Sequence, residues 1–217
     1  MNTAFVLAPE TGLPLFWDLI APVRQAGDRV EFWLPGPVPK APSPAFDSLC
    51  CPAPDLVIYG AAEGGVHANG RGPEDIRWHE SLLHWLEGLY AAQRPDLIIF
   101  PGTLTGHELG TRLAARIKGG CFPETRSLLR EGNRLFARKK VCGSNLDWDA
   151  GITEYPAVLT VTGKTTAQNS GEGGVPRLES RPVEPLTPPR WILAYEQSES
   201  FPSRPLETAP LIFAAGR

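Results

Sequence analysis

The segment Gly102–Glu108 has the residue types and spacing best suited to hold a ligand. It follows a short apolar run and precedes a helical pattern, and its candidate ligand contacts are Gly102, Thr103, Thr105 and Gly106. Small residues let a ligand approach the backbone, and free N–H groups at a helix start attract anions. The segment therefore predicts a nucleotide or phosphate site beyond the carboxyl end of a strand. An ordinary capped turn is the alternative, which the absence of GxGxxG and GxxxxGK[ST] motifs favours.

Two arginines on the helical pattern that follows form a second candidate site. Arg112 and Arg116 lie four residues apart, so they share one helix face. Guanidinium groups in this arrangement can grip an anion or the carboxylate of a partner protein. A charged outer face of the helix explains the same pair equally well.

No other polar residues form a convincing catalytic or metal-binding group. His79 and His84 are five residues apart on a helical pattern, so they lie on different faces and cannot act as an i, i+4 metal pair. Asp147 and Asp149 flank Trp148, and a solvated turn explains them better than a carboxylate pair. No GxSxG motif marks a nucleophile. We therefore expect binding, assembly or electron-carrier scaffolding rather than bond chemistry, with no catalytic residue and no metal.

The glycine-rich segment Gly60–Gly72 offers one further possibility. It contains His67 and Asn69 and has the composition of a loop that can close over a ligand. A mobile surface loop is the commoner explanation. An enzyme with a site between this loop and Gly102–His107 stays open as an alternative, although no matched acid, base or nucleophile supports it.

Composition limits the class of protein. The chain has 217 residues, of which 42% are hydrophobic, and a formal net charge of −3, so it lacks the excess of Lys and Arg that marks nucleic-acid or membrane-surface binding. Met1–Glu10 is too short and lacks the basic start of a signal peptide. No run approaches the ~18 apolar residues that span a bilayer. We therefore expect a cytoplasmic protein whose four cysteines, with no CxxC pair, are free and mostly buried thiols.

The elements that must position these residues alternate between strands and helices. The expected strands in the first half are Thr3–Ala8, Arg29–Leu34, Asp55–Tyr59 and Asp96–Phe100. The expected helices are Leu13–Gln25, Pro73–Gln93 and one from about Thr105, capped by Thr105 with Glu108, to about Lys118, where Gly119 and Gly120 end it. This order predicts an α/β fold with a mostly parallel sheet flanked by helices. Because Leu97–Phe100 is continuously apolar, we expect its strand to be central.

The second half of the chain has a different pattern. Short runs at Thr125–Leu129, Arg134–Lys140 and Val141–Ser144, with a turn signal at Glu131–Asn133, predict a hairpin-like region in which Arg138–Lys140 is a solvated edge. Ala157–Val161 is a clear strand. We divide the chain into an α/β domain over 1–162, a linker or extended arm over 163–190, and a closing part over 191–217 with strands at Trp191–Tyr195 and Leu211–Ala214.

Several motifs together resemble the amino-terminal domain of the electron-transfer flavoprotein alpha subunit. Asp96–Leu113, DLIIFPGTLTGHELGTRL, continues into AARIKGG and contains that family's L-x-x-R-[LV]-A-A-[RK] pattern from Leu109 to Arg116. Glu124 stands where the family has an acidic residue, and Gly143–Asn145 matches its G-[GS]-N segment. After Thr160-Val161 the family has Arg-Pro, which this chain lacks. Leu211–Arg217 resembles the [IV]-V-V-x-G-G-R-G entry into the family's second domain.

The resemblance implies an adenine nucleotide alpha hydrolase-like fold and a role in assembly. In that family the alpha subunit pairs with a beta subunit, and FAD carries electrons from dehydrogenases to a quinone reductase or another acceptor. AMP, or a second FAD, belongs to the beta subunit. By resemblance this chain is the scaffold domain that docks a beta subunit, and we assign partner contact to Arg112, Arg116 and Asn145.

The same resemblance places the family's flavin-binding motifs beyond Arg217, so that only Arg217 marks the edge of the flavin site and Pro210–Arg217 is the start of a further domain. We expect the chain alone to bind no FAD and to expose a large apolar surface for its partner. The main alternative is a stand-alone adenine-nucleotide-binding module that acts as a sensor or stress protein, with phosphate held at Gly102–Glu108.

Overall fold

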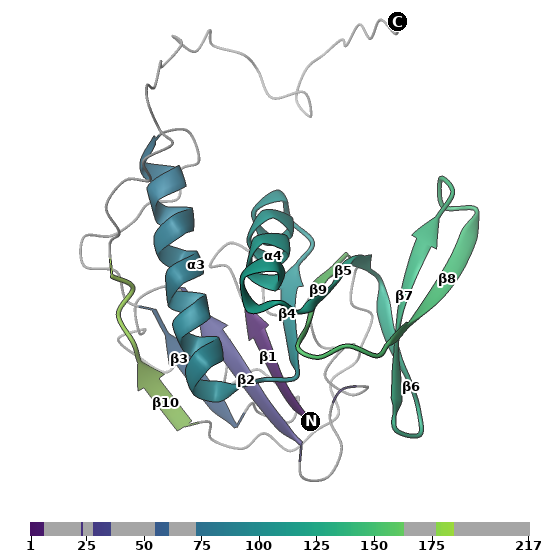
Figure 1. Ribbon diagram of the computed structural model, residues 1–217, viewed down its shortest axis with the longest axis horizontal. Helices are drawn as coiled ribbons and strands as arrows, with labels where there is room; N and C mark the ends of the chain where they lie inside the picture. The colour runs from purple at the N-terminus through teal and green to yellow at the C-terminus, as the bar shows by residue number, and fades with distance from the viewer. Residues whose placement is uncertain (7–22, 24–27, 36–54, 61–72, 163–176, 185–217) are drawn as a thin grey trace, which may run out of the picture.

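A parallel β-sheet forms the centre of the protein (Figure 1). The structure, a computed structural model, describes residues 1–6, 23, 28–35, 55–60, 73–162 and 177–184, and for 73–78 only the backbone. The sheet has seven strands in the order β10-β3-β2-β1-β4-β9-β5, and every neighbouring pair is parallel. Its strands are β1 (Asn2–Val6), β2 (Arg29–Leu34), β3 (Leu56–Tyr59), β4 (Leu97–Pro101), β5 (Gly120–Thr125), β9 (Ala157–Val161) and β10 (Arg177–Ser180). The predicted α/β class with a mostly parallel sheet is therefore confirmed.

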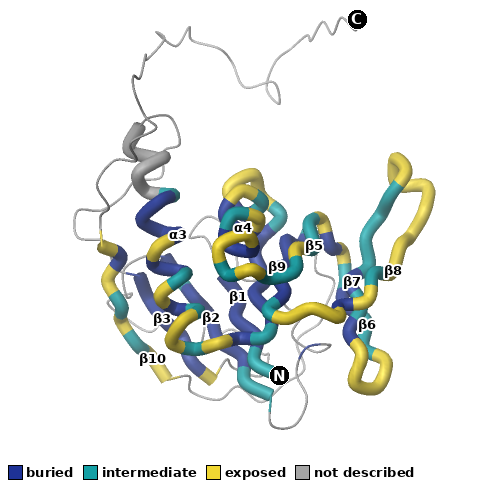
Figure 2. The backbone as a smooth tube through the Cα atoms, in the orientation of Figure 1, coloured by how far each residue is buried: buried dark blue, intermediate teal, exposed yellow. Residues whose placement is uncertain are grey.

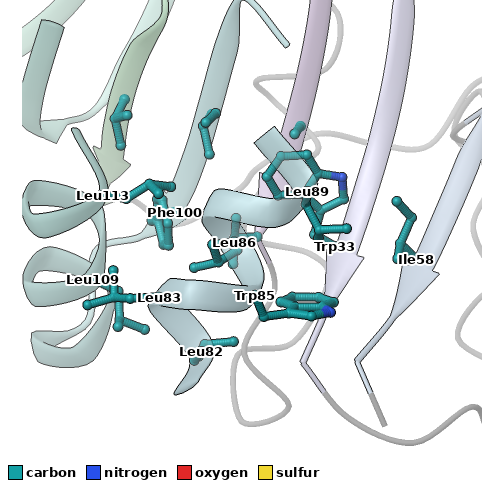
Figure 3. Packing of buried hydrophobic residues seen from close by; sticks show 14 of the residues in the cluster. Trp33, Ile58, Leu82, Leu83, Trp85, Leu86, Leu89, Phe100, Leu109 and Leu113 are labelled. Carbon is teal, nitrogen blue, oxygen red and sulfur yellow. The ribbon is translucent and has the colours of Figure 1, made fainter. Parts of the chain in front are cut away.

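Two helices cover one face of this sheet (Figure 1). They are α3 (Pro73–Gln93) and α4 (Leu104–Ile117), and each follows a strand and leads back to a parallel one. Their buried side chains pack on those of the central strands, with Leu86 and Leu89 of α3 near Trp33 and Leu109 and Leu113 of α4 near Phe100 (Figure 3). Leu82 and Trp85 of α3 are buried on the same face of the helix.

A three-stranded antiparallel sheet packs on the other side of the molecule. Its strands are β6 (Ser127–Glu131), β7 (Arg134–Val141) and β8 (Leu146–Ile152), in that order. Leu128, Leu135 and Ile152 join the core cluster that includes Phe5, so this sheet covers part of the second face of the main sheet. Figure 2 shows buried central strands in dark blue and exposed residues in yellow where the β7–β8 hairpin extends away from the body.

The structure corrects several sequence-based element predictions. The expected strand at Val141–Ser144 is wrong, because Cys142 and Ser144 adopt left-handed conformations and form the turn between β7 and β8. Asp147 and Asp149 lie on strand β8 rather than on a solvated turn. The Arg138–Lys140 run lies on the central strand of its sheet and not on an edge, because β8 pairs along its whole length.

Two strands of the main sheet were not predicted at all. β5 contains Pro123 and a register irregularity between Phe122 and Thr125, so it has no strand-like pattern of its own. β10 lies within the predicted linker over 163–190, where it pairs with β3 and brings Val183 into the core cluster on the helix side. The predicted elements at Trp191–Tyr195 and Leu211–Ala214, and most of the Gly60–Gly72 loop, fall outside the described residues. Of the predicted helix at Leu13–Gln25 only Val23 is described, and it is helical and buried in the core.

Candidate functional site

The predicted ligand-binding segment lies at the topological switch point of the main sheet. β1 is flanked by β2 on one side and by β4 on the other, so the chain leaves the carboxyl ends of β1 and β4 in opposite directions. Open α/β sheets bind ligands outside such ends, in the crevice that the diverging connections create. The Gly102–Glu108 turn follows β4 directly and opens α4, so it occupies this position.

The glycines of the turn serve close packing within the chain. A Cβ atom on Gly106 would lie 1.9 Å from the Pro101 carbonyl oxygen, and one on Gly102 would lie 2.2 Å from Thr162 Cγ2. The Gly102 N–H donates to the Val161 carbonyl at 2.7 Å. Both predicted contact residues are therefore required by the contact of the turn with β4 and β9, whether or not a ligand approaches.

Thr103 caps the helix, which corrects the predicted cap at Thr105. The Thr103 side chain accepts a hydrogen bond from the Gly106 N–H at 3.0 Å, and α4 begins at Leu104. The cap falls two residues earlier because the turn closes directly after β4. At the other end, α4 ends at Ile117 and Lys118 is the C-cap, in the left-handed conformation (φ 55°) that was expected of Gly119.

The first turn of α4 keeps two features that suit an anion: the N–H groups of Leu104 and Thr105, and the exposed side chain of Thr105. The N–H groups of Leu104 and Thr105 belong to the helix start, where no intrahelical acceptor exists, and the Thr103 cap serves only Gly106. Thr103 and Thr105 are exposed, and the Leu104 side chain is 88% exposed. Thr105 therefore stays available to a ligand, while Gly102, Thr103 and Gly106 already make contacts within the chain.

A hydrogen-bonded group that the sequence did not predict lies behind this turn. The Thr160 hydroxyl on β9 is fully buried, accepts from the Glu124 N–H at 3.0 Å and lies 2.7 Å from His107 Nδ1. Because the hydroxyl has a single hydrogen, the arrangement is satisfied when that hydrogen is donated to Nδ1 and Nε2 carries the imidazole proton. Glu124 holds a left-handed backbone (φ 58°) at the irregular part of β5. His107 is thus oriented by Thr160 of β9, whose hydroxyl is in turn bound to β5.

The two predicted arginines bind carboxylates of their own chain. Glu80 of α3 is buried and forms ion pairs with both arginines. Its Oε1 accepts a hydrogen bond from Arg112, and its Oε2 accepts one from Arg116 Nη2 at 2.8 Å. Arg112 also bonds to Glu108 at 3.0 Å, and Arg116 to Glu87 at 3.1 Å. Burial lowers the pKa of the Arg112 guanidinium, and the nearby charge of Arg116 lowers it further. The arrangement joins α3 to α4.

The remaining predicted contact residues lie apart from the turn. Asn145 is exposed at the tip of the β7–β8 hairpin, where its N–H donates to the Cys142 carbonyl at 3.4 Å. Cys142 and Cys121 are free and exposed, so for these two the expectation of buried thiols is wrong, and Cys50 and Cys51 fall outside the described residues. His79 contacts Glu108 at 3.4 Å, while His84 points to Glu87 on another face of α3. Arg217 falls outside the described residues.

Glu80 and Thr160 are the functional-site residues that sequence reasoning missed. Each interrupts an apolar pattern: Thr160 lies inside the AVLTV run of β9, and Glu80 precedes the Leu82–Leu83 pair on the buried side of α3. A polar residue in an apolar position is a signal for a buried hydrogen-bond partner, but its partner becomes visible only in three dimensions.

Within the described ranges, no group of three or more His, Cys, Asp or Glu residues is arranged to hold a metal ion. Of the helices in those ranges, none combines the length and the apolar character needed to cross a bilayer. Comparison of the sequence with models of protein families finds no match, and comparison with curated proteins finds none either.

Proposed function

We propose that the chain is the docking domain of an electron-transfer flavoprotein alpha subunit. In this role it assembles with a beta-subunit-like protein and supports electron transfer through FAD from dehydrogenases to a quinone-reductase-type acceptor. The motif order described above and the mostly parallel sheet, which is the fold the resemblance implies, both support the proposal.

The observation that carries the proposal is that the predicted ligand-binding groups Gly102, Thr103 and Gly106 make their contacts within the chain. Gly102, Thr103 and Gly106 bond or pack within the chain, and Arg112 and Arg116 bind carboxylates of α3. A catalytic site needs an acid, a base or a nucleophile directed at a substrate. The β7–β8 hairpin instead presents exposed apolar side chains to solvent, as a docking protein requires.

Co-expression with the beta-subunit-like protein of the same genome tests this function. We expect the two chains to elute together in size-exclusion chromatography with light scattering, as one copy of each. We also expect the purified chain alone to show no flavin absorbance after incubation with FAD. Stoichiometric flavin on the isolated chain, or no complex with the beta-subunit-like protein, would contradict the proposal.

A stand-alone adenine-nucleotide-binding module is the second candidate. It is favoured by the position of α4 at the switch point and by the N–H groups of Leu104 and Thr105, which the Thr103 cap leaves open. Calorimetry with AMP, ATP and FAD distinguishes the two functions. Binding of AMP or ATP to the isolated chain, weakened by Thr105→Val, would favour the nucleotide module over the docking domain.

A further inference from the structure

The β7–β8 hairpin has one apolar face and one charged face. Residues Leu135, Ala137 and Ile152 point into the core, and the strand pairing places Lys139, Val141, Leu146 and Trp148 on the same face further along. At this distal end Leu146 is 58% exposed and Trp148 is 53% exposed. The apolar face that forms the core near the body therefore continues into solvent beyond it. Figure 1 shows the β7–β8 hairpin projecting from the body at this end.

The opposite face of the same end is built from ion pairs. Arg138 donates from Nε and Nη2 to the two oxygens of Asp149, both at 2.7 Å, and Lys140 lies 3.1 Å from Asp147 Oδ1. The side chains of Asp147 and Asp149 remain 53% and 39% exposed. A carboxylate has about four lone-pair sites, so both aspartates can accept further bonds from a second set of cations.

β8 is also an edge strand within the described part of the chain, where its neighbour is β7 alone. Its outer edge presents backbone N–H and C=O groups that an added strand can pair with. The residues Leu146–Asp149 therefore combine an open strand edge, exposed apolar side chains and exposed carboxylates. Lys139, whose Nζ lies 5.8 Å from the centre of the Trp148 ring, shows that a cation already stacks there.

Charge determines what can occupy this edge. If two copies paired antiparallel through β8 with their apolar faces aligned, registers centred on Asp147, Trp148 or Asp149 would each place an aspartate directly opposite another aspartate. Like charges in directly opposed positions destabilise a strand pair. The edge therefore disfavours a second copy and favours a strand of opposite charge.

We propose that this edge of β8 docks an extended segment of a partner protein with Lys or Arg at alternate positions and apolar residues between them. The cations of the segment face Asp147 and Asp149, and its apolar residues cover Leu146 and Trp148. β7 shows the same alternation of cations on the inner edge, where Arg138 and Lys140 stand opposite the two aspartates. The residue between them is Lys139, which lies opposite Trp148 and covers its ring as a cation. The inference goes beyond the proposed function, since it requires neither a flavin nor a beta subunit.

A peptide with the β7 sequence, Arg134–Val141 (RLFARKKV), is the probe. It is titrated into the ¹⁵N-labelled full chain, and amide shifts are followed by NMR. We expect shift changes on β8 and on the indole N–H of Trp148. Replacing Arg138 and Lys140 of the peptide by Glu should weaken binding about tenfold or more, because two attractive cross-strand pairs become repulsive.

Two protein variants keep the test independent of folding. Asp147→Asn removes one exposed carboxylate and Trp148→Thr removes the exposed ring, and each should weaken the peptide while the amide spectrum of the core stays unchanged. The proposal is overturned if the two peptides bind equally, if the shifts fall on α4 or elsewhere, or if no binding occurs. A dimer of the chain that Trp148→Thr dissociates would also overturn it, since a second copy would then be the occupant.

Discussion

The turn Gly102–Glu108 and the distal β7–β8 hairpin represent opposite uses of polar and small residues. The turn has the composition of a ligand site, yet its glycines pack on Pro101 and Thr162 and its cap serves its own helix. The hairpin has the composition of ordinary surface, yet it leaves an aromatic ring, an aliphatic side chain and a strand edge exposed. Residue type alone thus predicts poorly whether a group is free to bind a ligand or partner. What matters is whether neighbouring elements of the chain already bond to that group or pack against it.

Gly106 gives the strongest test of whether the turn packs tightly against β4. In Gly106→Ala the new Cβ would meet the Pro101 carbonyl oxygen, so α4 must shift from β4, and we expect the free energy of unfolding to fall by about 3 kcal/mol. Urea denaturation measures this change. Gly88→Ala on α3 is the control, because no atom lies within 4 Å of the new methyl. It should raise stability by about 0.5–1 kcal/mol, and equal effects for both variants would contradict the close packing.

Glu80 tests whether the arginines are committed to their own chain. Glu80→Gln removes the charge that Arg112 and Arg116 share, and we expect a loss of about 2 kcal/mol, typical of hydrogen bonds to charged groups. Urea is the denaturant of choice because it does not screen charge. Glu87→Gln, which breaks a more exposed pair with Arg116, should change stability by less than about 0.5 kcal/mol. If the Glu80 variant lost no more than its control, both arginines would be free for a partner.

Thr160 and Thr3 form a matched pair of buried threonines. Thr160→Val removes the hydroxyl between the Glu124 N–H and His107, and should destabilise by about 1–2 kcal/mol because a buried donor loses its acceptor. The Thr3 hydroxyl is buried with no hydrogen-bond partner among the described residues, so Thr3→Val should be neutral or stabilising. The His107 ring nitrogens, followed by ¹⁵N NMR, should change their tautomer balance only in the Thr160 variant.

The five central strands of the main sheet were predictable because they are buried on both faces. Leu97–Phe100 is continuously apolar and Ala157–Val161 nearly so. The structure confirms both as strands, β4 and β9, and shows that they pair with each other. β5 and β10 were missed because they are edge strands without a continuous apolar run. β5 contains Pro123, and β10 has only four residues, mostly exposed, so pairing with a neighbouring strand rather than their own residues holds them extended.

The position of the candidate site was predictable, but its internal bonding was not. A turn of small residues between strand and helix marks the carboxyl end of a parallel strand, which is where Gly102–Glu108 lies. Glu80 is 32 positions from Arg112, and Thr160 is 53 positions from His107. The cap at Thr103 depends on where the chain turns after β4. Such long-range partners leave no local pattern in the sequence.

The hairpin should respond to mutation in the opposite way from the turn. Trp148→Thr keeps a strand-forming residue at an exposed position and should change the free energy of unfolding by less than about 0.5 kcal/mol. The buried control Trp33→Thr should lower the free energy of unfolding by about 3 kcal/mol or more. Trp33 is a residue of β2 whose side chain is fully buried in the core cluster that also contains side chains of α3 and α4. A large loss on changing Trp148 would mean that the ring is packed against the chain and is not a docking surface.

The smallest expected effect is the titration of Asp149. Its hydrogen bonds from Arg138 hold the pKa of this carboxyl below its ordinary value, so the ion pair is intact above about pH 4 and is lost as the pH falls through the lowered pKa. Arg138→Gln should move the Asp149 pKa back up, as followed by ¹³C NMR of the carboxyl carbon. Lys140→Gln should leave it unchanged, since Lys140 pairs with Asp147. If both variants moved the Asp149 pKa equally, the carboxylates of β8 would respond to the general positive charge of β7, and a docked strand would need no defined spacing of its cations.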